Sequence, residues 1–159
     1  MRTSTLRGSV ASVAAAAVVG SSASRGGRDV RYLLLRKPSY QPPASVFPVV
    51  WTSLYTDIAL TSAATIDELE DAGRRDEATA YRVALAVNLV LNASWTWIFF
   101  NRRKLGPAAL TAGALAVSSA DLTRRAVGAR PRGGWALVPY PLWCGFATVL
   151  ATHIWRLNR

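Results

Sequence analysis

The sequence contains a single cysteine, Cys144, and a single histidine, His153. A lone cysteine forms no intrachain disulfide, and neither residue belongs to a group with the spacing of metal ligands. The sequence therefore predicts neither a disulfide-stabilised fold nor a metal site.

Motifs that carry catalysis are also missing from the 159 residues. There is no paired-carboxylate motif, nucleophile elbow, glycine-rich phosphate loop or HExxH sequence. A net charge of +10 is present, but no zinc-finger, RRM or KH signature accompanies it, so we do not expect nucleic acid as a partner. These absences argue against a water-soluble enzyme.

Charged residues are few, and they are clustered. They make up 18% of the chain, against roughly 25% in an average soluble domain. Six of the nine acids lie in residues 67–77, and most Lys and Arg lie in residues 25–37, 74–82, 102–104 and 124–132. Basic clusters beside long apolar segments are typical of membrane helices where they meet lipid headgroups. The pattern predicts an all-α integral membrane protein in contact with a lipid bilayer.

Five apolar segments approach the length of about 20 residues that a helix needs to cross a bilayer. In lipid each segment must pair its own backbone amides, so each should be a helix. The first could equally be a signal peptide, and Pro139 and Pro141 are expected to kink the last. We expect a single domain, residues 1–159, with helices at about 8–24, 46–66, 83–101, 105–120 and 133–155 and a first loop at about 25–45.

Aromatic and amide side chains recur at helical spacing on three of these segments. On the third segment one face carries Asn88, Asn92, Trp95 and Phe99. Similar faces carry Trp51, Tyr55, Ile58 and Ser62 on the second segment, and Tyr140, Trp143, Ala147, Leu150 and Ile154 on the fifth. Amides are costly toward lipid, so the faces should point inward. They either pack helices together or line a cavity for a large, flat, apolar ligand.

Two ionisable residues in or near the apolar segments need separate interpretation. Asp57 lies six residues beyond Trp51, about 240° around a helix of 3.6 residues per turn and thus off the aromatic face. We expect its carboxylate to pair with another helix. His153 is either a structural residue near a helix end or a ligand for haem iron.

Three motifs in order indicate a known family. They are residues 37–43 (KPSYQPP) with 46–55 (VFPVVWTSLY), residues 91–95 (LNASW) with 99–100 (FF), and residues 139–143 (PYPLW) with 146–148 (FAT) and 155–158 (WRLN). From about residue 32 to 158 the chain resembles the TspO/MBR family. These are the tryptophan-rich sensory proteins, related to the translocator protein or peripheral benzodiazepine receptor.

The resemblance implies five transmembrane helices, commonly in a homodimer, that bind porphyrins such as protoporphyrin IX and sterol-like small molecules. It implies no required cofactor and no metal, with porphyrin as the ligand. The cavity should lie between the helices, under the first loop as a lid. Residues expected to line it are Trp51, Tyr55, Asn88, Asn92, Trp95, Tyr140, Trp143, Phe146 and Ala147, with Tyr32, Pro42 and Pro43 in the lid loop.

The sequence departs from the family pattern at several positions. Thr111 stands near an acid of the fourth helix, Ala151 stands for an asparagine, Thr152 for the tyrosine of a cholesterol motif, and Ser45 for a tryptophan. Sterol binding through the fifth helix is therefore not expected.

Three functions are compatible with these residues. The favoured one is a membrane receptor or carrier for porphyrins, with a transport or stress-signalling role. The alternatives are an enzyme for light- or oxygen-dependent porphyrin degradation and a structural membrane protein without a ligand. The Ala- and Arg-rich composition favours a multi-pass protein of a bacterial cell membrane.

Overall fold

The computed structural model describes residues 2–24, 34–101 and 104–159, with the side chains of all of these except 21–24, 100 and 101. Its long helices are α1 (Thr3–Ser24), α3 (Val46–Asp71), α4 (Arg75–Thr96), α5 (Leu105–Ala129) and α6 (Pro139–Leu157). A π-helical turn, η2 (Trp97–Asn101), continues α4, and a 3₁₀ turn, η3 (Gly134–Leu137), precedes α6. No strand occurs in these residues.

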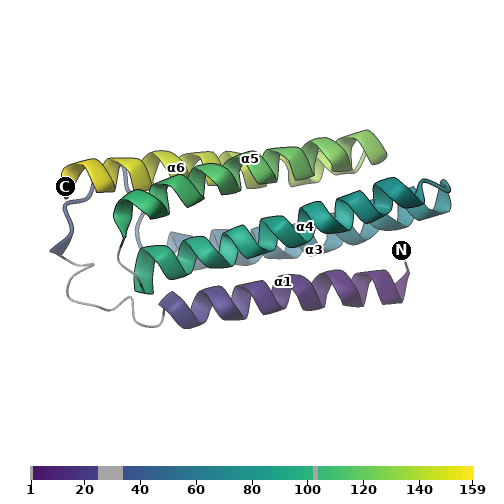
Figure 1. Cartoon of the computed structure of the whole chain (residues 1–159), viewed down its shortest axis with the longest axis horizontal. Coiled ribbons are helices and arrows are strands. Elements are labelled where there is room, and N and C mark those ends of the chain that lie inside the picture. Colours follow the sequence, from purple (N-terminus) through teal and green to yellow (C-terminus); the bar gives the residue numbers. More distant parts are fainter. Residues whose placement is uncertain (1, 25–33, 102–103) are drawn as a thin grey trace.

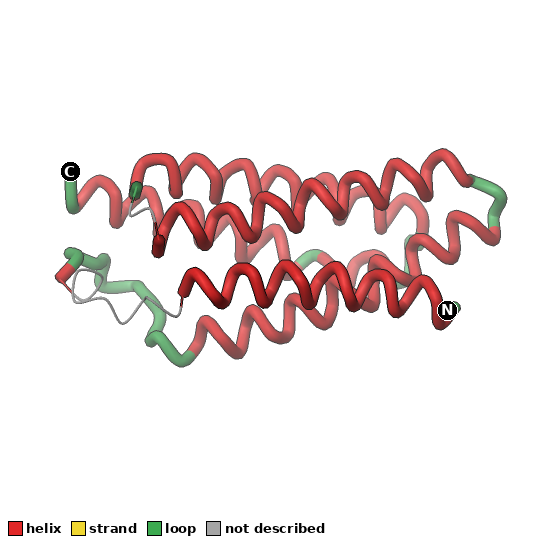
Figure 2. Tube along the Cα trace, turned by 60° about the horizontal axis from the view of Figure 1, so that its bottom comes forward, coloured by secondary structure: helices red, strands yellow, loops and turns green. Residues whose placement is uncertain are grey.

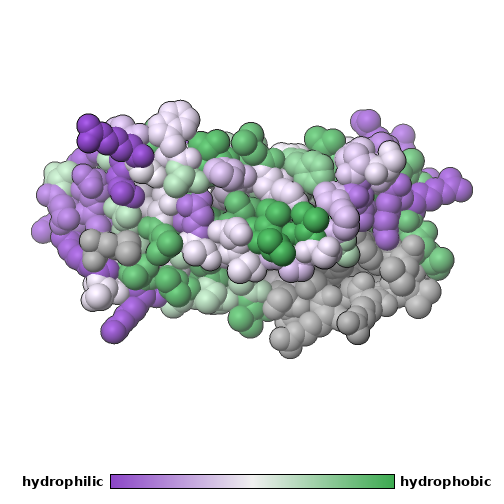
Figure 3. Space-filling view, turned by 180° about the vertical axis from the view of Figure 1, so that it is seen from behind, coloured by the Kyte–Doolittle hydropathy of each residue, from purple (hydrophilic) through white to green (hydrophobic). Residues whose placement is uncertain are grey.

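The five long helices lie side by side along one axis (Figure 1). The loop of residues 34–45 lies at the same end of the bundle as the C-terminus, and α1 begins at the opposite end (Figures 1 and 2). Hydrophilic residues gather at both ends of the face in Figure 3, with hydrophobic residues between them. This is the pattern of a bundle whose middle meets lipid and whose ends meet water.

Within the described residues, three helical segments are long and apolar enough to cross a membrane: Arg75–Phe99, Leu105–Ala129 and Gly134–Leu157. Together with the helical content of the described residues, they confirm the expected all-α membrane fold. Tyr32, one of the expected lid residues, lies outside the described residues.

Most helices extend beyond the apolar segments that predicted them. The expected fourth helix ended at residue 120, but α5 continues to Ala129. Its extension is supported by Asp121, which pairs with Arg124 and Arg125 at 2.6 Å, the i,i+3 and i,i+4 spacings at which helical side chains meet. The hydropathy of the sequence shows only which part of a helix is apolar. Backbone hydrogen bonds continue the helix beyond that part into water, so the predicted end came too early.

The prolines of the last segment begin the helix and do not kink it. Pro139 is the first residue of α6 and Pro141 lies in its first turn. A first turn leaves backbone N–H groups without intrahelical partners, so proline loses nothing there. The expected kink is therefore wrong, because the helix starts later than residue 133.

Close contacts hold the ends of the bundle in place. A Cβ on Gly134 would lie 2.4 Å from the backbone carbonyl carbon of Ala126, so only glycine lets η3 approach α5 this closely. At the opposite end, Trp97 donates its indole N–H to the carbonyl oxygen of Val19 at 3.2 Å. The first segment is thus a helix that packs against α3, α4 and η2.

Candidate ligand-binding site

A buried hydrogen-bond network crosses the centre of the bundle. The Tyr140 hydroxyl donates to Oδ1 of Asn88 at 2.7 Å and accepts from Nδ2 of Asn92 at 3.4 Å. Tyr55 donates to Oδ1 of Asn92 at 2.8 Å, and Nδ2 of Asn88 donates to the Ser118 hydroxyl at 3.1 Å. Side chains from α3, α4, α5 and α6 are thereby joined.

This network explains why two amides are tolerated in an apolar bundle. Asn88 and Tyr140 are fully buried and Asn92 is 1% exposed. A buried polar group without a partner costs about 1–3 kcal/mol, so each amide needs the hydroxyls that surround it. The network fixes the register of α4 against α6.

Aromatic rings from α3, α4 and η2 form one group beside this network. Trp51 lies 5.4 Å from Tyr55 and 6.5 Å from Trp95 between ring centroids. Trp95 stacks on Phe99 at 5.7 Å, with 25° between the ring planes. The face expected from helical spacing on the third segment is therefore continuous, and the π-helical turn carries its last member.

A second group joins α3, α6 and the lid loop. Phe47 contacts Trp143 edge to face at 5.8 Å, and Trp143 lies 5.4 Å from Phe146. Tyr40, in the loop, reaches Phe146 at 6.4 Å. Phe47 and Trp51 are one helical turn apart on α3, so that helix connects the two aromatic groups.

The lid loop is clamped to the end of α6. The backbone N–H of Arg36 donates to Oδ1 of Asn158, and Nδ2 of Asn158 donates to the Arg36 carbonyl oxygen, both at 2.9 Å. The Tyr40 hydroxyl lies 3.1 Å from Nδ1 of His153. These polar contacts close the loop over the second aromatic group.

Two buried polar atoms in this region have no hydrogen-bond partner within the described part of the chain. They are the indole Nε1 of Trp143 and Oε1 of Gln41, in the lid loop. Buried polar groups normally find partners, so such atoms are candidates for contacts with a ligand or water. Both lie at the lid end of the bundle.

The structure places most of the expected site residues in these two groups and in the hydrogen-bond network beside them. Pro42 and Pro43 lie in the lid loop, where the Pro43 carbonyl oxygen accepts from the backbone N–H of Val46 at 3.0 Å. Ala147 is half-buried on α6, one turn beyond Trp143. Asp57 differs from expectation: it accepts from Thr61 on its own helix at 2.8 Å.

The sequence analysis did not single out four residues that the structure adds. They are Tyr40, Phe47, Ser118 and Asn158. The first two lie inside the motif of residues 37–55, which could have suggested them. Asn158 ends the motif of residues 155–158, which could likewise have suggested it. Ser118 has no signal in the sequence, because its partner Asn88 lies 30 residues away.

Comparison with known proteins gives one consistent result. The model of the TspO/MBR family matches residues 9–156. The chain is 31% identical to the protein CrtK of Rhodobacter capsulatus over 91% of this chain and 88% of that protein. It is 32% identical to the tryptophan-rich sensory protein of Cereibacter sphaeroides, over 89% and 87% of the two chains. It is 31% identical to the human translocator protein, over 88% and 82%.

Proposed function

The chain belongs to the TspO/MBR family of integral membrane proteins, and on that premise we propose that it is a membrane receptor or carrier. Its ligands are porphyrins such as protoporphyrin IX and other large apolar molecules, taken up between the aromatic groups under the lid loop. A transport or stress-signalling role is part of the same proposal.

One observation carries the proposal, the convergence of aromatic rings at the lid end of the bundle. Rings arrive there from the lid loop, α3, α4, η2 and α6: Tyr40, Phe47, Trp51, Tyr55, Trp95, Phe99, Trp143 and Phe146. Packing alone needs volume, which Leu and Ile supply. Rings offer flat faces for a conjugated macrocycle, and each aromatic pair contributes about 0.5–1.5 kcal/mol beyond burial.

Polar groups beside the rings would orient the ligand. The hydroxyl–amide network lies beside the first aromatic group. The indole N–H of Trp143 and the side-chain carbonyl oxygen of Gln41 are available as a donor and an acceptor. A few directed polar contacts in an otherwise apolar site are the usual composition of a small-molecule pocket. Uptake requires the lid loop to leave α6, so the contacts of Asn158 and His153 set a barrier to exchange.

Quenching of tryptophan fluorescence by protoporphyrin IX in detergent tests the proposal. We expect saturable quenching at about one ligand per chain. Replacing two stacking indoles by the smaller ring of Phe, Trp51→Phe with Trp143→Phe, should weaken binding about tenfold, since a loss of about 0.7 kcal/mol at each position sums to about 1.4 kcal/mol.

The matched control is Trp135→Phe with Trp155→Phe. It also removes two indoles, but these are 62% and 37% exposed and lie outside the two aromatic groups. Its affinity should equal that of the wild type. Equal affinity in both double variants would reject the site, and quenching that never saturates would favour the structural alternative.

Illumination of the complex separates the receptor from the porphyrin-degrading enzyme. A receptor returns intact protoporphyrin IX after light exposure, with its absorption band unchanged against a protein-free control. Loss of that band with formation of a distinct product would favour the enzyme.

A further inference from the structure

His153 lies near the end of α6 and contacts the lid loop directly. Its Nδ1 atom lies 3.1 Å from the Tyr40 hydroxyl, and the two ring centroids are 5.7 Å apart. Tyr40 also contacts Phe146 of the second aromatic group, with 6.4 Å between the ring centroids. Any change in the attachment of Tyr40 to His153 therefore changes the cover over that aromatic group.

Histidine is the side chain whose charge changes between about pH 5 and 8. His153 is half-buried, so water reaches this ring while the bundle stays folded. One nitrogen of a neutral imidazole accepts a hydrogen bond, whereas both nitrogens of the protonated ring donate. The Tyr40 hydroxyl can therefore donate to the neutral ring and accept from the protonated one. Because the hydrogen bond survives protonation, the decisive change is the added positive charge.

The charged side chains at this end of the bundle are all basic in the described part of the chain. They are Arg36 and Lys37 in the lid loop, Lys104 before α5, and Arg156 and Arg159 at the end of α6. Residues 46–54 of α3 carry no ionisable side chain, and neither does η2. The nearest acid on α3 is Asp57, about three helical turns from the start of that helix. A protonated His153 thus meets described cations and no described acidic side chain at the lid end.

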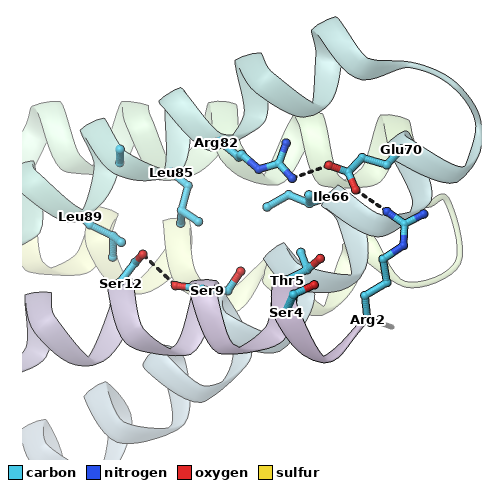
Figure 4. Close-up of a pocket in the computed structure, with 12 residues that line it drawn as sticks. Arg2, Ser4, Thr5, Ser9, Ser12, Ile66, Glu70, Arg82, Leu85 and Leu89 are labelled. Carbon is cyan, nitrogen blue, oxygen red and sulfur yellow. Dashed lines mark hydrogen bonds and ion pairs between the residues drawn. The ribbon is translucent and has the colours of Figure 1, made fainter.

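The opposite end of the bundle has its charges paired. Glu70 accepts from Arg82 at one carboxylate oxygen and from Arg2 at the other, beside a recess between α1 and α4 (Figure 4). Asp121 likewise pairs with Arg124. By contrast, the arginines at the lid end form no ion pair with a described residue. Because like charges repel, a further positive charge is disfavoured where the existing ones are not neutralised.

We propose that protonation of His153 releases the lid loop from α6. The neutral ring holds Tyr40 against the end of the helix. The protonated ring repels Arg36 and Lys37, which lie four and three residues before Tyr40 in the loop. Arg156, about one helical turn further along α6, adds to the positive charge that the loop meets. The closed lid therefore binds a proton less readily than the open lid, so closure is favoured at high pH and weakens as the pH falls.

One interaction opposes this release. A cation is attracted to the face of an aromatic ring, so a protonated His153 gains from its contact with Tyr40. The two rings are tilted by 38° and Tyr40 is 45% exposed, so the gain is small because water competes for the charge. Repulsion comes from several cations, and release is the expected net result. The inference concerns the lid loop and holds for any ligand beneath it.

Distances between two spin labels, measured by electron paramagnetic resonance, report the lid position without any ligand. One label is attached at Ser39→Cys in the lid loop and the other at Thr79→Cys on α4, both exposed positions, after Cys144→Ser removes the native thiol. In uncharged detergent we expect a second distance population that grows severalfold as the pH falls from about 8 to about 5. High salt should reduce this change, because salt screens the repulsion between exposed charges.

Variants at the two contacting residues separate the charge from the hydrogen bond. His153→Gln keeps a hydrogen-bonding side chain that does not titrate, and it should hold the lid closed over the whole pH range. His153→Arg is charged at every pH and should show the second population already at about pH 8. Tyr40→Phe is the matched control, because it removes only the hydroxyl and should keep the pH response.

Three results would each overturn the proposal. They are a distance distribution that does not change with pH in the wild-type background, a pH response of equal size in His153→Gln, and a lid that closes further at low pH. Circular dichroism at each pH checks folding, and a loss of helical signal that accompanies the second population would assign the change to unfolding and also overturn it. Because no porphyrin is present, the outcome is independent of the proposed function, which fluorescence quenching tests separately.

Discussion

Removing one hydroxyl from the centre of the bundle should have a large effect on stability. In Tyr140→Phe the ring stays and only the oxygen is lost. Oδ1 of Asn88 then loses its donor at 2.7 Å, and Nδ2 of Asn92 loses its acceptor at 3.4 Å. Because Asn88 is fully buried, water cannot replace the hydroxyl without opening the bundle.

The magnitude follows from the two orphaned amide atoms. A buried polar atom left without a partner costs about 1–3 kcal/mol, and interhelical hydrogen bonds in membranes average about 0.6 kcal/mol with a maximum near 1.7. We expect a loss of about 1.5 kcal/mol. In a chain of this size, 1 kcal/mol shifts the melting temperature by about 2–4 °C, so the decrease should be about 3–6 °C.

The matched comparison is Tyr55→Phe, which removes one donor to the same network at 2.8 Å. Tyr55 is only half-buried, so water can reach Asn92 from its side and the decrease should be smaller. Melting is followed by circular dichroism in detergent, with protoporphyrin IX affinity as a check on folding. If Tyr140→Phe melts at the wild-type temperature, or Tyr55→Phe is the more damaging, the reasoning about the network is refuted.

Three further predictions concern the lid loop, the ion pair between Glu70 and Arg82, and two glycines. Asn158→Ala removes two lid contacts of 2.9 Å and should speed porphyrin dissociation severalfold in stopped-flow fluorescence; an unchanged rate would show that the clamp does not control exchange. The hydrogen bond from Arg82 lowers the pKa of Glu70 below its usual 4.5, so its stabilisation is present above pH 4.5 and lost as pH falls through the lowered value. The melting temperature of Glu70→Gln should therefore depend less on pH between 5 and 3 than that of the wild type, and parallel curves would contradict this. Gly134→Ala places a Cβ against the α5 backbone and should cost about 1–3 kcal/mol by overpacking. Gly8→Ala, inside α1 and with open space around it, should instead raise the melting temperature by about 1–4 °C, because Ala favours a helix over Gly by about 0.5–1 kcal/mol.

Local properties of the chain determined the secondary structure and the helix faces. Helical spacing puts Asn88, Asn92, Trp95 and Phe99 on one face wherever the helix lies in space, because 3.6 residues per turn is a local constraint. The long apolar segments with charged ends likewise predicted a helical membrane protein before any packing was considered.

Partner choice required the tertiary structure. For Asn88 the partners are Tyr140 and Ser118, on two other helices. Asp57 is the exception, because its partner Thr61 lies four residues further along the same helix, at 2.8 Å, a contact that helical spacing alone allows. Two helix ends also differ from the prediction. In α5 the backbone hydrogen bonds continue beyond the apolar residues, so the helix ends later than predicted. In α6 a proline begins the helix, so it starts later than predicted.

The sequence by itself thus determined the membrane class, the helical segments and the inward faces, since each depends on residues a few positions apart. Only the tertiary structure decided which faces meet. It joined Tyr140 to Asn88 across 52 residues and Arg2 to Glu70 across 68. Contacts at such separations depend on the rotation and register of whole helices, which are set by the packing of all their side chains together.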